Sequence, residues 1–331
     1  MTKALITGGC GVIGSHLIDA LLDRGAFVTV IDNLSTGKIT NVEHNLDNPR
    51  LHLINDSILN EALMDELIRD CTVVFHLAAA VGVKYICDDP LRGILTNVRG
   101  AEIVFACAFK YWKRVVFAST SEVYGRSDRI PFAEDGERVL GPTFIDRWSY
   151  STGKAVDEHL AFAYSRKGLA VSVLRYFNSY GPRIDESGYG SVAAKFISQA
   201  LRGAPITVHG DGRQTRCFTY IDDTIRGTLL AAESSRAKGE AFNIGSNRET
   251  SIEELAHMVR EITGSPSKIV HVPYEDYYGE YYEDTRRRIP NIEKAGKMLG
   301  FEPVVELEEG LAKTVDWAKK HYKLKTAVEV T

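Results

Sequence analysis

The chain has 331 residues, a formal net charge of −4, and 44% hydrophobic against 25% charged residues. At about 150 residues per domain, this length predicts two domains with a sizeable core. A near-neutral chain has no general attraction for nucleic acid or anionic lipid. No stretch reaches the ~18 consecutive apolar residues of a membrane span. We therefore expect neither nucleic acid nor a membrane as a partner.

The cysteines and the first residues bear on the cellular compartment. The five cysteines are scattered and never spaced as Cys-x-x-Cys, which argues against a disulfide framework or a zinc site. Residues 1–9 enter a predicted strand and a glycine turn directly, so we expect no signal peptide. The expectation is a cytoplasmic protein without a metal site.

The first half of the chain alternates short apolar strands with amphipathic helices. Strands are predicted at residues 4–6, 27–31, 51–54, 73–77, 114–118 and 170–175, and helices at 14–24, 61–68, 91–110 and 148–166. Continuous apolar strands between helices are typical of a parallel sheet covered on both faces. The predicted fold class is α/β, a Rossmann-type doubly wound sheet with its binding crevice at the carboxyl ends of the strands.

Beyond residue 178 the sequence becomes rich in glycine and proline, which indicates a smaller α/β domain of short elements. Residues 242–245 have the pattern of a late strand that rejoins the first sheet. We therefore predict two interleaved domains. The first domain, with the doubly wound sheet, covers residues 1–177, with 218–245 returning to it, and the second covers 178–217 and 246–331.

A glycine-rich loop lies between the first predicted strand and the first helix. It reads Thr7-Gly8-Gly9-Cys10-Gly11-Val12-Ile13-Gly14, and its glycines let a pyrophosphate approach the backbone N–H groups of the helix N-terminus. Asp32 ends the second strand, where a carboxylate accepts hydrogen bonds from ribose and repels a 2′-phosphate. This pattern predicts NAD rather than NADP. Asp56, which ends the third strand, is either an adenine contact or a cap for the helix that follows.

A second group of residues is suited to acid–base chemistry. Tyr150 and Lys154 are four positions apart, which places a phenol and an ammonium on one helix face. Thr120 follows a predicted strand and reaches the same edge of the sheet. We expect Lys154 to lower the pKa of Tyr150, so that the phenolate acts as a base on a secondary alcohol while nicotinamide takes the hydride. Taken alone, the Tyr–Lys pair also fits a solvent-exposed helix face.

Further motifs extend over nearly the whole chain. They are residues 7–14, Asp32-Asn33-Leu34-Ser35-Thr36-Gly37, His76-Leu77-Ala78-Ala79, Asn97, residues 119–125, residues 147–154, Arg175-Tyr176-Phe177-Asn178, Tyr180-Gly181-Pro182-Arg183, residues 277–280, 288–292 and 299–303. With these motifs the sequence resembles the extended short-chain dehydrogenase/reductases that act on nucleotide-sugars. Within that family it is most similar to the UDP-glucuronate decarboxylases. This group includes UDP-xylose synthase, UDP-apiose synthase and the decarboxylase domain of the enzyme that makes aminoarabinose for lipid A.

The resemblance implies NAD as cofactor, a UDP-sugar as substrate, and a homodimer built on the helices near residues 91–110 and 148–166. The implied cofactor contacts are Gly8, Gly11, Val12, Ile13, Gly14, Asp32, Asn33, Ser35, Thr36, Gly37, Asp56, Ser57, Leu77, Ala78, Ala79, Asn97, Tyr150 and Lys154. The implied substrate contacts are Ser121, Arg147, Asn178, Arg183, Lys195, Arg216, Tyr282 and Arg288.

Few residues distinguish the reactions of this family. The 4,6-dehydratases carry Asp-Glu after the active-site threonine, and simple 4-epimerases usually lack the glutamate, whereas Ser121-Glu122 and Arg288 resemble the decarboxylases. Oxidation of C4 makes the C5 carboxylate a β-keto acid, and Thr120 and Tyr150 would stabilise the enolate that CO2 loss leaves. Arg288, with Glu122, would orient the carboxylate and arrange protonation at C5. The expected activity is NAD-dependent decarboxylation of UDP-glucuronate to UDP-xylose or a UDP-4-keto-pentose.

Other interpretations stay open at this point. A 4-epimerase of UDP-glucuronate or of another nucleotide-sugar would oxidise C4 without losing CO2. Ser121 disfavours a 4,6-dehydratase, and the intact catalytic residues disfavour a dinucleotide sensor without activity. Glu122 also fits a helix cap, and Arg288 also fits a solvated basic run. Decarboxylases carry an arginine about where Ser191 stands, so either Lys195 replaces it or the enzyme acts on a different sugar acid.

Overall fold

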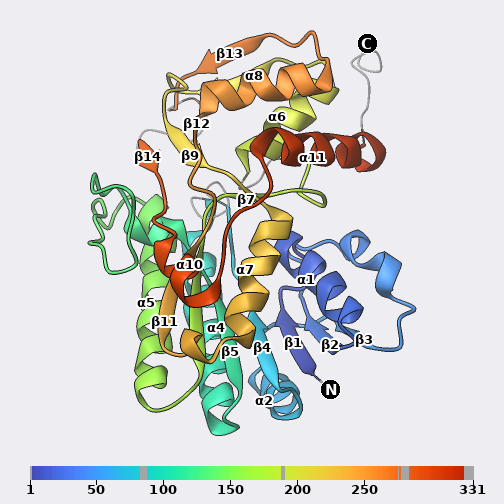
Figure 1. Cartoon of the computed structure of the whole chain (residues 1–331), viewed down its shortest axis with the longest axis vertical. Coiled ribbons are helices and arrows are strands. Elements are labelled where there is room, and N and C mark those ends of the chain that lie inside the picture. Colours follow the sequence, from blue (N-terminus) through green and yellow to red (C-terminus); the bar gives the residue numbers. More distant parts are fainter. Residues whose placement is uncertain (1, 83–87, 188–190, 275, 277–282, 324–331) are drawn as a thin grey trace.

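The structure is a computed structural model that describes residues 2–82, 88–187, 191–274, 276 and 283–323. Its central feature is a seven-stranded sheet in the order β11-β6-β5-β4-β1-β2-β3 (Figure 1). All neighbouring strands of this sheet are parallel. The strands are β1 (Lys3–Thr7), β2 (Phe27–Ile31), β3 (Leu51–Ile54), β4 (Val73–His76), β5 (Arg114–Thr120), β6 (Val171–Tyr176) and β11 (Glu240–Ile244). The predicted Rossmann-type α/β fold is confirmed.

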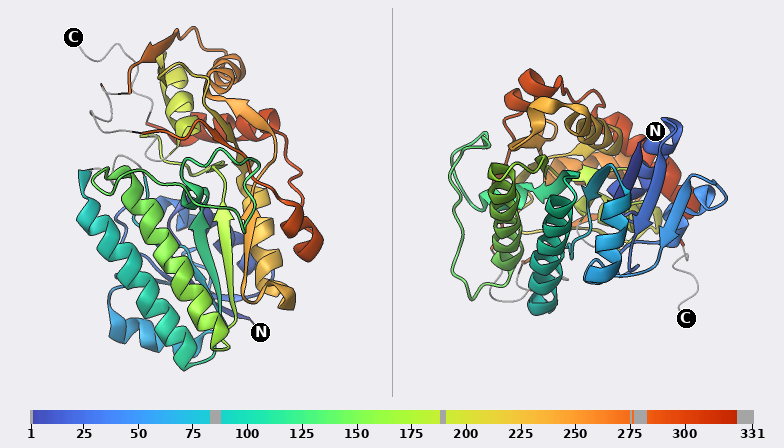
Figure 2. Two further views of the ribbon diagram at one scale, coloured as in Figure 1. Left: turned by 90° about the vertical axis from the view of Figure 1, so that its left-hand side faces the viewer. Right: turned by 90° about the horizontal axis from the view of Figure 1, so that it is seen from below.

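Helices cover both faces of this sheet because successive strand residues point to opposite sides. In β4, Phe75 packs in one apolar cluster with residues of α1 (Val12–Asp23) and α7 (Ile221–Glu233). Val74 packs in another with residues of α2 (Glu61–Asp70), α4 (Pro90–Lys110) and α5 (Arg147–Arg166). Figure 2 shows α4 and α5 lying side by side along one face of the sheet. The sheet is therefore buried on both sides, as its continuous apolar strands predict.

The small sheets and the helices α6, α8 and α11 lie beyond the carboxyl end of the central sheet (Figure 1). Short strands form three small sheets: β7 (Ser179–Tyr180) with β10 (Thr219–Tyr220), β8 (Ile206–His209) with β13 (Ile269–Val272), and β9 (Thr215–Cys217) between β12 (Glu249–Ser251) and β14 (Arg287–Arg288). The longer helices here are α6 (Val192–Leu201), α8 (Ile252–Thr263) and α11 (Leu307–His321). The shorter helices are η1 (Ile39–Asn41), η2 (Glu43–Asn45), η3 (Ser121–Tyr124), η4 (Ser235–Ala237) and α10 (Glu293–Leu299). Of these, α10 packs beside β11, and η4 directly precedes β11 at the amino end of the sheet.

Two details of the sheet bear on function. The strand order reverses between β1 and β4, which is where doubly wound folds bind their ligands. β5 continues past the predicted end at residue 118, because Ser119 and Thr120 remain paired with Arg175 and Tyr176 of β6. Thr120 is therefore held by the sheet itself.

No helix in the described part of the chain has the length and apolar character to cross a membrane. The boundaries between the two domains remain a prediction.

Candidate active site

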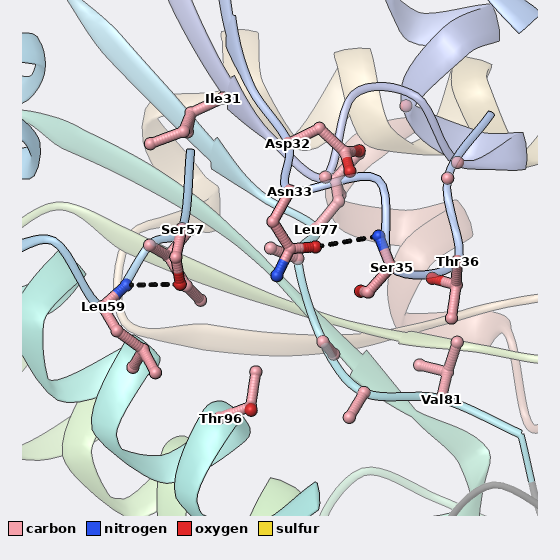
Figure 3. A pocket seen from close by; sticks show the side chains of 18 of the residues that line it. Ile31, Asp32, Asn33, Ser35, Thr36, Ser57, Leu59, Leu77, Val81 and Thr96 are labelled. Carbon is pink, nitrogen blue, oxygen red and sulfur yellow. Dashed lines mark hydrogen bonds between the residues drawn. The ribbon is translucent and has the colours of Figure 1, made fainter. Parts of the chain in front are cut away.

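A pocket of about 720 Å³ opens at the carboxyl ends of the strands, next to the point where their order reverses. Figure 3 shows side chains from the loop after β2, from Ser57 and Leu59, and from Thr96 of α4 around this pocket. Most of the predicted cofactor contacts line it: Gly8, Gly11, Val12, Ile13, Gly14, Asp32, Asn33, Ser35, Thr36, Gly37, Asp56, Ser57, Leu77, Ala78 and Ala79. The fold thus brings together segments that are up to about 110 residues apart in sequence.

The glycines of the first loop are required by close backbone packing. Gly8 has a φ of +73°, and a Cβ there would lie 2.8 Å from the backbone of Ala78. A Cβ on Gly14 would lie 2.4 Å from the carbonyl oxygen of Gly8. α1 begins directly after Gly11, which provides no side-chain cap, so the first N–H groups of the helix can receive a phosphate. This cradle fits the pyrophosphate of a dinucleotide.

Asp32 and Asp56 stand where the pocket would hold the nucleoside half of a dinucleotide. Asp32 is 8% exposed, and its carboxylate accepts hydrogen bonds from the N–H groups of Cys10 and Leu34, both at 2.8 Å. A carboxylate has about four acceptor positions, so two lone pairs are left for ribose hydroxyls. Asp56 lines the pocket and also accepts hydrogen bonds from Ser57 N and Asn60 Nδ2. Asn60, rather than Asp56, is the N-cap of α2.

Asn97 is buried and is not among the residues that line the pocket, and its contact with the cofactor stays a prediction. Its amide oxygen accepts a hydrogen bond from Ala80 N at 2.6 Å, and its Nδ2 donates to Ala80 O at 3.2 Å. Asn97 therefore ties α4 to the segment after β4. In this structure it shapes the pocket through the backbone of Ala80.

Tyr150 and Thr120 meet at the inner end of the site, as predicted. The two side chains are hydrogen-bonded, and this bond favours the phenolate. Burial nevertheless raises the pKa of Tyr150, and the negative charges of Glu122 and Asp157 raise it further. Our expectation of a lowered pKa is therefore wrong for the protein without ligands. Burial is the largest cause of this difference.

The Lys154 ammonium is turned toward groups that the sequence analysis did not consider. It lies 3.5 Å from Asp157 Oδ2 and 4.1 Å from the centre of the Phe117 ring. Burial lowers the pKa of Lys154, whereas the charge of Asp157 opposes that shift. Lys154 is 2% exposed. The alternative of a solvent-exposed helix face for the Tyr–Lys pair is thus excluded, since the ammonium is enclosed between α5 and β5.

Next to Tyr150 lies a buried cluster of arginines and carboxylates. The carboxylate of Glu122 contacts Arg288 at 2.8 Å and Arg147 at 3.2 Å. Asp284 contacts Arg216 at 2.8 Å and Arg147 at 3.5 Å. Parallel pairing of β14 with β9 sets Arg288 beside Arg216, so residues far apart in sequence converge on one point. Within the described residues, three guanidinium groups thus share two carboxylates.

The charges of this cluster determine its protonation. Burial opposes ionisation of Glu122, but the positive charges of Arg147, Arg288 and Arg216 outweigh burial and lower its pKa to about 2. Glu122 is therefore ionised at any physiological pH. Arg288 is 5% exposed, and its Nε has no hydrogen-bond partner among the described residues. A buried guanidinium N–H without an acceptor is costly, which suits a site that receives an anionic group from a ligand.

A second buried network lies beneath the catalytic residues and connects β5, α5 and β6. Arg175 donates to both carboxylate oxygens of Glu158, at 2.9 and 2.6 Å. Ser119, the neighbour of Thr120, donates to the same carboxylate. Arg175 also donates to Tyr124 Oη at 2.8 Å. Because Glu158 is one helical turn after Lys154, this network holds the helix and the strand in register at the site.

The other predicted substrate contacts are more dispersed. Ser121 is buried at the start of η3, and Asn178 donates through Nδ2 to the carbonyl of Cys217 at 2.9 Å. Arg183 pairs with Asp19 of α1 at 2.6 Å, which places it away from the arginine cluster. Tyr282 lies outside the described residues.

Lys195 and Ser191 are both on α6, at the substrate side of the fold. Lys195 Nζ lies 2.7 Å from His209 Nε2, and burial lowers the Lys195 pKa to about 8. Ser191 is the N-cap of α6, where its hydroxyl accepts from Ala194 N. It caps the helix rather than presenting a charge.

Two residues of the site were missed by the sequence analysis. Asp284 bridges two arginines, and no local motif singles it out. Asp157 follows Lys154 by three positions, so helical spacing would have placed it on the same face as the Tyr–Lys pair.

Comparison with known protein families decides what kind of protein carries this site. The family model described as GDP-mannose 4,6 dehydratase matches residues 5–314. The chain belongs to this family of extended short-chain dehydrogenase/reductases. It is an enzyme of the nucleotide-sugar branch. The predicted resemblance is confirmed, and the alternative of a non-catalytic sensor is set aside.

Individual relatives differ in the reaction that they perform. The chain is 44% identical to a UDP-N-acetyl-alpha-D-glucosaminuronate decarboxylase of Bacillus cytotoxicus, over 96% of this chain and 98% of that protein. It is 37% identical to UDP-glucuronic acid decarboxylase 1 of Xenopus tropicalis, over 96% of this chain and 72% of that protein. Among solved structures, a UDP-glucuronic acid 4-epimerase of Bacillus cereus, in complex with UDP-glucuronic acid and NAD, matches with a TM-score of 0.86 at 31% identity, over 97% of this chain and 100% of that chain.

Proposed function

We propose that this enzyme decarboxylates a UDP-linked hexuronate, with NAD as a cofactor that is regenerated in each cycle. The observation that carries the proposal is the buried Arg288–Glu122 pair beside the hydrogen-bonded Thr120 and Tyr150. A guanidinium with a spare N–H binds a carboxylate strongly. A substrate that presents its carboxylate to Arg288 would have its neighbouring hydroxyl near Tyr150.

The first pocket fits the proposed cofactor. The glycine cradle would hold the pyrophosphate, and Asp32 would hold the adenosine ribose. NAD, when bound, would accept a hydride from C4 of the sugar and later return it. Asp32 would also disfavour NADP, since a 2′-phosphate would meet its negative charge.

The side chains of the protein would transfer the proton, stabilise the enolate and orient the substrate carboxylate. Tyr150 would take the proton of the C4 hydroxyl, and Thr120 would hydrogen-bond the same oxygen. With C4 as a ketone, the bond from C5 to the carboxylate breaks, CO2 leaves, and its electron pair forms the enolate of C5 and C4. A proton from water then adds to C5 and restores the C4 ketone. Tyr150 and Thr120 would stabilise the enolate oxygen. Since Glu122 is ionised, it has no proton to donate, so we assign it to orienting Arg288.

We propose UDP-glucuronate or its 2-acetamido analogue as the sugar acid. UDP-glucuronate follows from the motif pattern and would give UDP-xylose or a UDP-4-keto-pentose. The analogue is supported by the 44% identity with the Bacillus cytotoxicus decarboxylase along almost its whole length. It also agrees with Ser191, which caps α6 where the UDP-glucuronate decarboxylases carry an arginine. The two sugars differ only at C2, away from the carboxylate that Arg288 would bind.

The test is to incubate the protein with NAD and each UDP-hexuronate and to measure released CO2 and the mass of the product. We expect one CO2 to be released for each molecule of a product that has lost its carboxyl group. A product of unchanged mass with inverted C4 would instead identify a 4-epimerase. Failure of both substrates to react with NAD would refute the proposal.

We further infer a cytoplasmic homodimer. Exposed apolar side chains lie on α4, where Ile94 is 41% exposed, and on α5, where Val156 is 39% exposed. A dimer through these two helices would bury them. The free, buried cysteines Cys10, Cys71, Cys107 and Cys217 suit a reducing compartment. Sedimentation of the protein should give twice the mass of one chain, and a monomer would contradict the inference.

A further inference from the structure

Asp157 is a buried carboxylate to which the proposed function gives no role. It follows Tyr150 by seven positions and Lys154 by three on α5, so the three side chains share one helix face. Its side chain is 1% exposed, and Oδ2 lies 3.5 Å from Lys154 Nζ. Neither carboxylate oxygen has a hydrogen-bond partner of good geometry among the described residues.

Such an arrangement is unfavourable for a purely structural residue. A buried carboxylate is normally satisfied by several hydrogen bonds, and a buried ion pair contributes little to stability on its own. The Lys154 ammonium, which also lies over the Phe117 ring, supplies nearly all of the compensation for Asp157. The pair is therefore better explained by its effect on the third member of the face, Tyr150.

We propose that Asp157 is a positioning residue that holds the Lys154 ammonium and cancels its charge at Tyr150, and so sets how readily the phenol loses its proton. The proposal rests on the proposed role of Tyr150 as the base. With Asp157 ionised, the Lys–Asp pair is neutral overall and stabilises a phenolate only weakly. Without that negative charge, Lys154 would act on Tyr150 with its full positive charge.

The protonation equilibria agree in direction with this geometry. Burial raises the pKa of Tyr150, and Asp157 is one of the two negative groups that raise it further. Burial lowers the pKa of Lys154, and Asp157 is the first group that counteracts this. Burial also raises the pKa of Asp157 to about 6, against the attraction of Lys154. Removing the charge of Asp157 should thus lower the pKa of both Tyr150 and Lys154.

Other charged and titratable groups near this face do not take over that role. Glu122 of η3 acts on Tyr150, but it is paired with arginines. Glu158 of α5 is held by Arg175 of β6. The remaining groups are His76 of β4, whose pKa burial lowers to about 3 so that it is neutral, and the mutually paired, exposed Arg99 and Glu102 of α4.

The test is the pH profile of kcat and kcat/KM for Asp157→Asn. Residues seven positions apart on a helix are ~10 Å apart, and a unit charge at that distance with an effective dielectric constant near 20 shifts a pKa by about one unit. We expect the limb set by Tyr150 to move to lower pH by about one unit, and a limb set by Lys154, which lies only 3.5 Å from Asp157, to move further in the same direction. Asp157→Glu, which keeps the negative charge, should have the same pH profile as the wild type. Asp316→Asn, an exposed carboxylate of α11, is the matched control.

A second neutral variant keeps the test conclusive if Asp157→Asn does not fold. Asp157→Ser leaves room for a water beside the ammonium, and it should shift the profile in the same direction as Asp157→Asn. A folded neutral variant whose profile coincides with the wild type overturns the proposal. Loss of folding in both neutral variants also overturns it, because the pair would then serve stability alone.

Tyr150→Phe separates this inference from the proposed function. If Tyr150→Phe is inactive and Asp157→Asn leaves the profile unmoved, only the role of Asp157 is wrong. If Tyr150→Phe is active, the base is wrongly assigned. In that case the role of Asp157 can still be tested by the absorbance of the Tyr150 phenolate, which is the part of the tyrosinate signal that is missing from Tyr150→Phe. This absorbance should arise at lower pH in Asp157→Asn than in the wild type, and an unchanged position overturns the inference.

Discussion

Glu122→Gln changes one atom and removes the negative charge that holds Arg288 and Arg147 together. Glu122 contacts these two side chains at 2.8 and 3.2 Å. In the variant, two guanidinium groups share an uncharged amide. We expect Arg288 to lose its fixed orientation, whereas Thr120 and Tyr150 keep their hydrogen bond.

The cost in stability can be worked from the pKa of Glu122. The pKa falls from 4.5 to about 2 on folding, and at 1.36 kcal/mol per unit the ionised carboxylate stabilises the fold by about 3 kcal/mol. A depressed pKa gives stability that is present above about pH 4.5 and is lost as pH falls toward 2. For 331 residues, the unfolding entropy is about 0.7 kcal/mol/K, so Tm should fall by about 4 °C.

The catalytic consequence is selective. Loss of a preorganised charge commonly lowers the rate of the step that it serves by about a hundredfold or more. The assay follows reduced nicotinamide by its ultraviolet absorbance and CO2 from a substrate labelled in its carboxyl group. We expect the variant to form reduced nicotinamide but to release CO2 at least about a hundredfold more slowly. Glu137→Gln, at an exposed glutamate paired with Arg129, is the control and should behave like the wild type.

Two results would refute this reasoning. A variant with full decarboxylase activity would show that Glu122 has no part in the loss of CO2. A variant that fails to reduce nicotinamide would place Glu122 in the oxidation step instead. A constant Tm difference from the wild type between pH 5 and 8 is expected, since Glu122 is ionised throughout that range.

Three other substitutions test the remaining parts of the site. Gly14→Ala places a Cβ 2.4 Å from a carbonyl oxygen, so calorimetry should detect no NAD binding; Gly93→Ala, where a Cβ meets nothing within 4 Å, should bind normally. Asp32→Asn should weaken NAD and admit NADP, and unchanged selectivity in a binding assay would contradict the assigned role. Glu158→Gln leaves the buried Arg175 without its counter-charge and should cost about 3–5 kcal/mol. Urea unfolding measures that loss, which would be near zero if the pair were unimportant.

Local sequence patterns were sufficient for the main elements and for most of the cofactor pocket. The apolar runs and the glycine loop depend on neighbours in sequence, so the sheet, α1 and Asp32 could be placed without coordinates. Element ends were less accurate: β5 extends to Thr120 because it remains paired with β6, a non-local interaction. Asn97 belongs to a matching motif, yet it contacts Ala80 rather than lining the pocket. A motif specifies a residue type, whereas its contacts depend on how the backbone packs.

The amino-acid sequence by itself determined the fold class, the dinucleotide loop and the family, because each depends on local patterns and motifs along the chain rather than on contacts between distant segments. Only the tertiary structure decided the charge balance at the site. Arg147, Arg216, Arg288, Glu122 and Asp284 come from distant segments, and Asp157 neutralises the lysine that was expected to activate Tyr150. Electrostatic effects depend on distance and burial in space, and these are set when the chain folds.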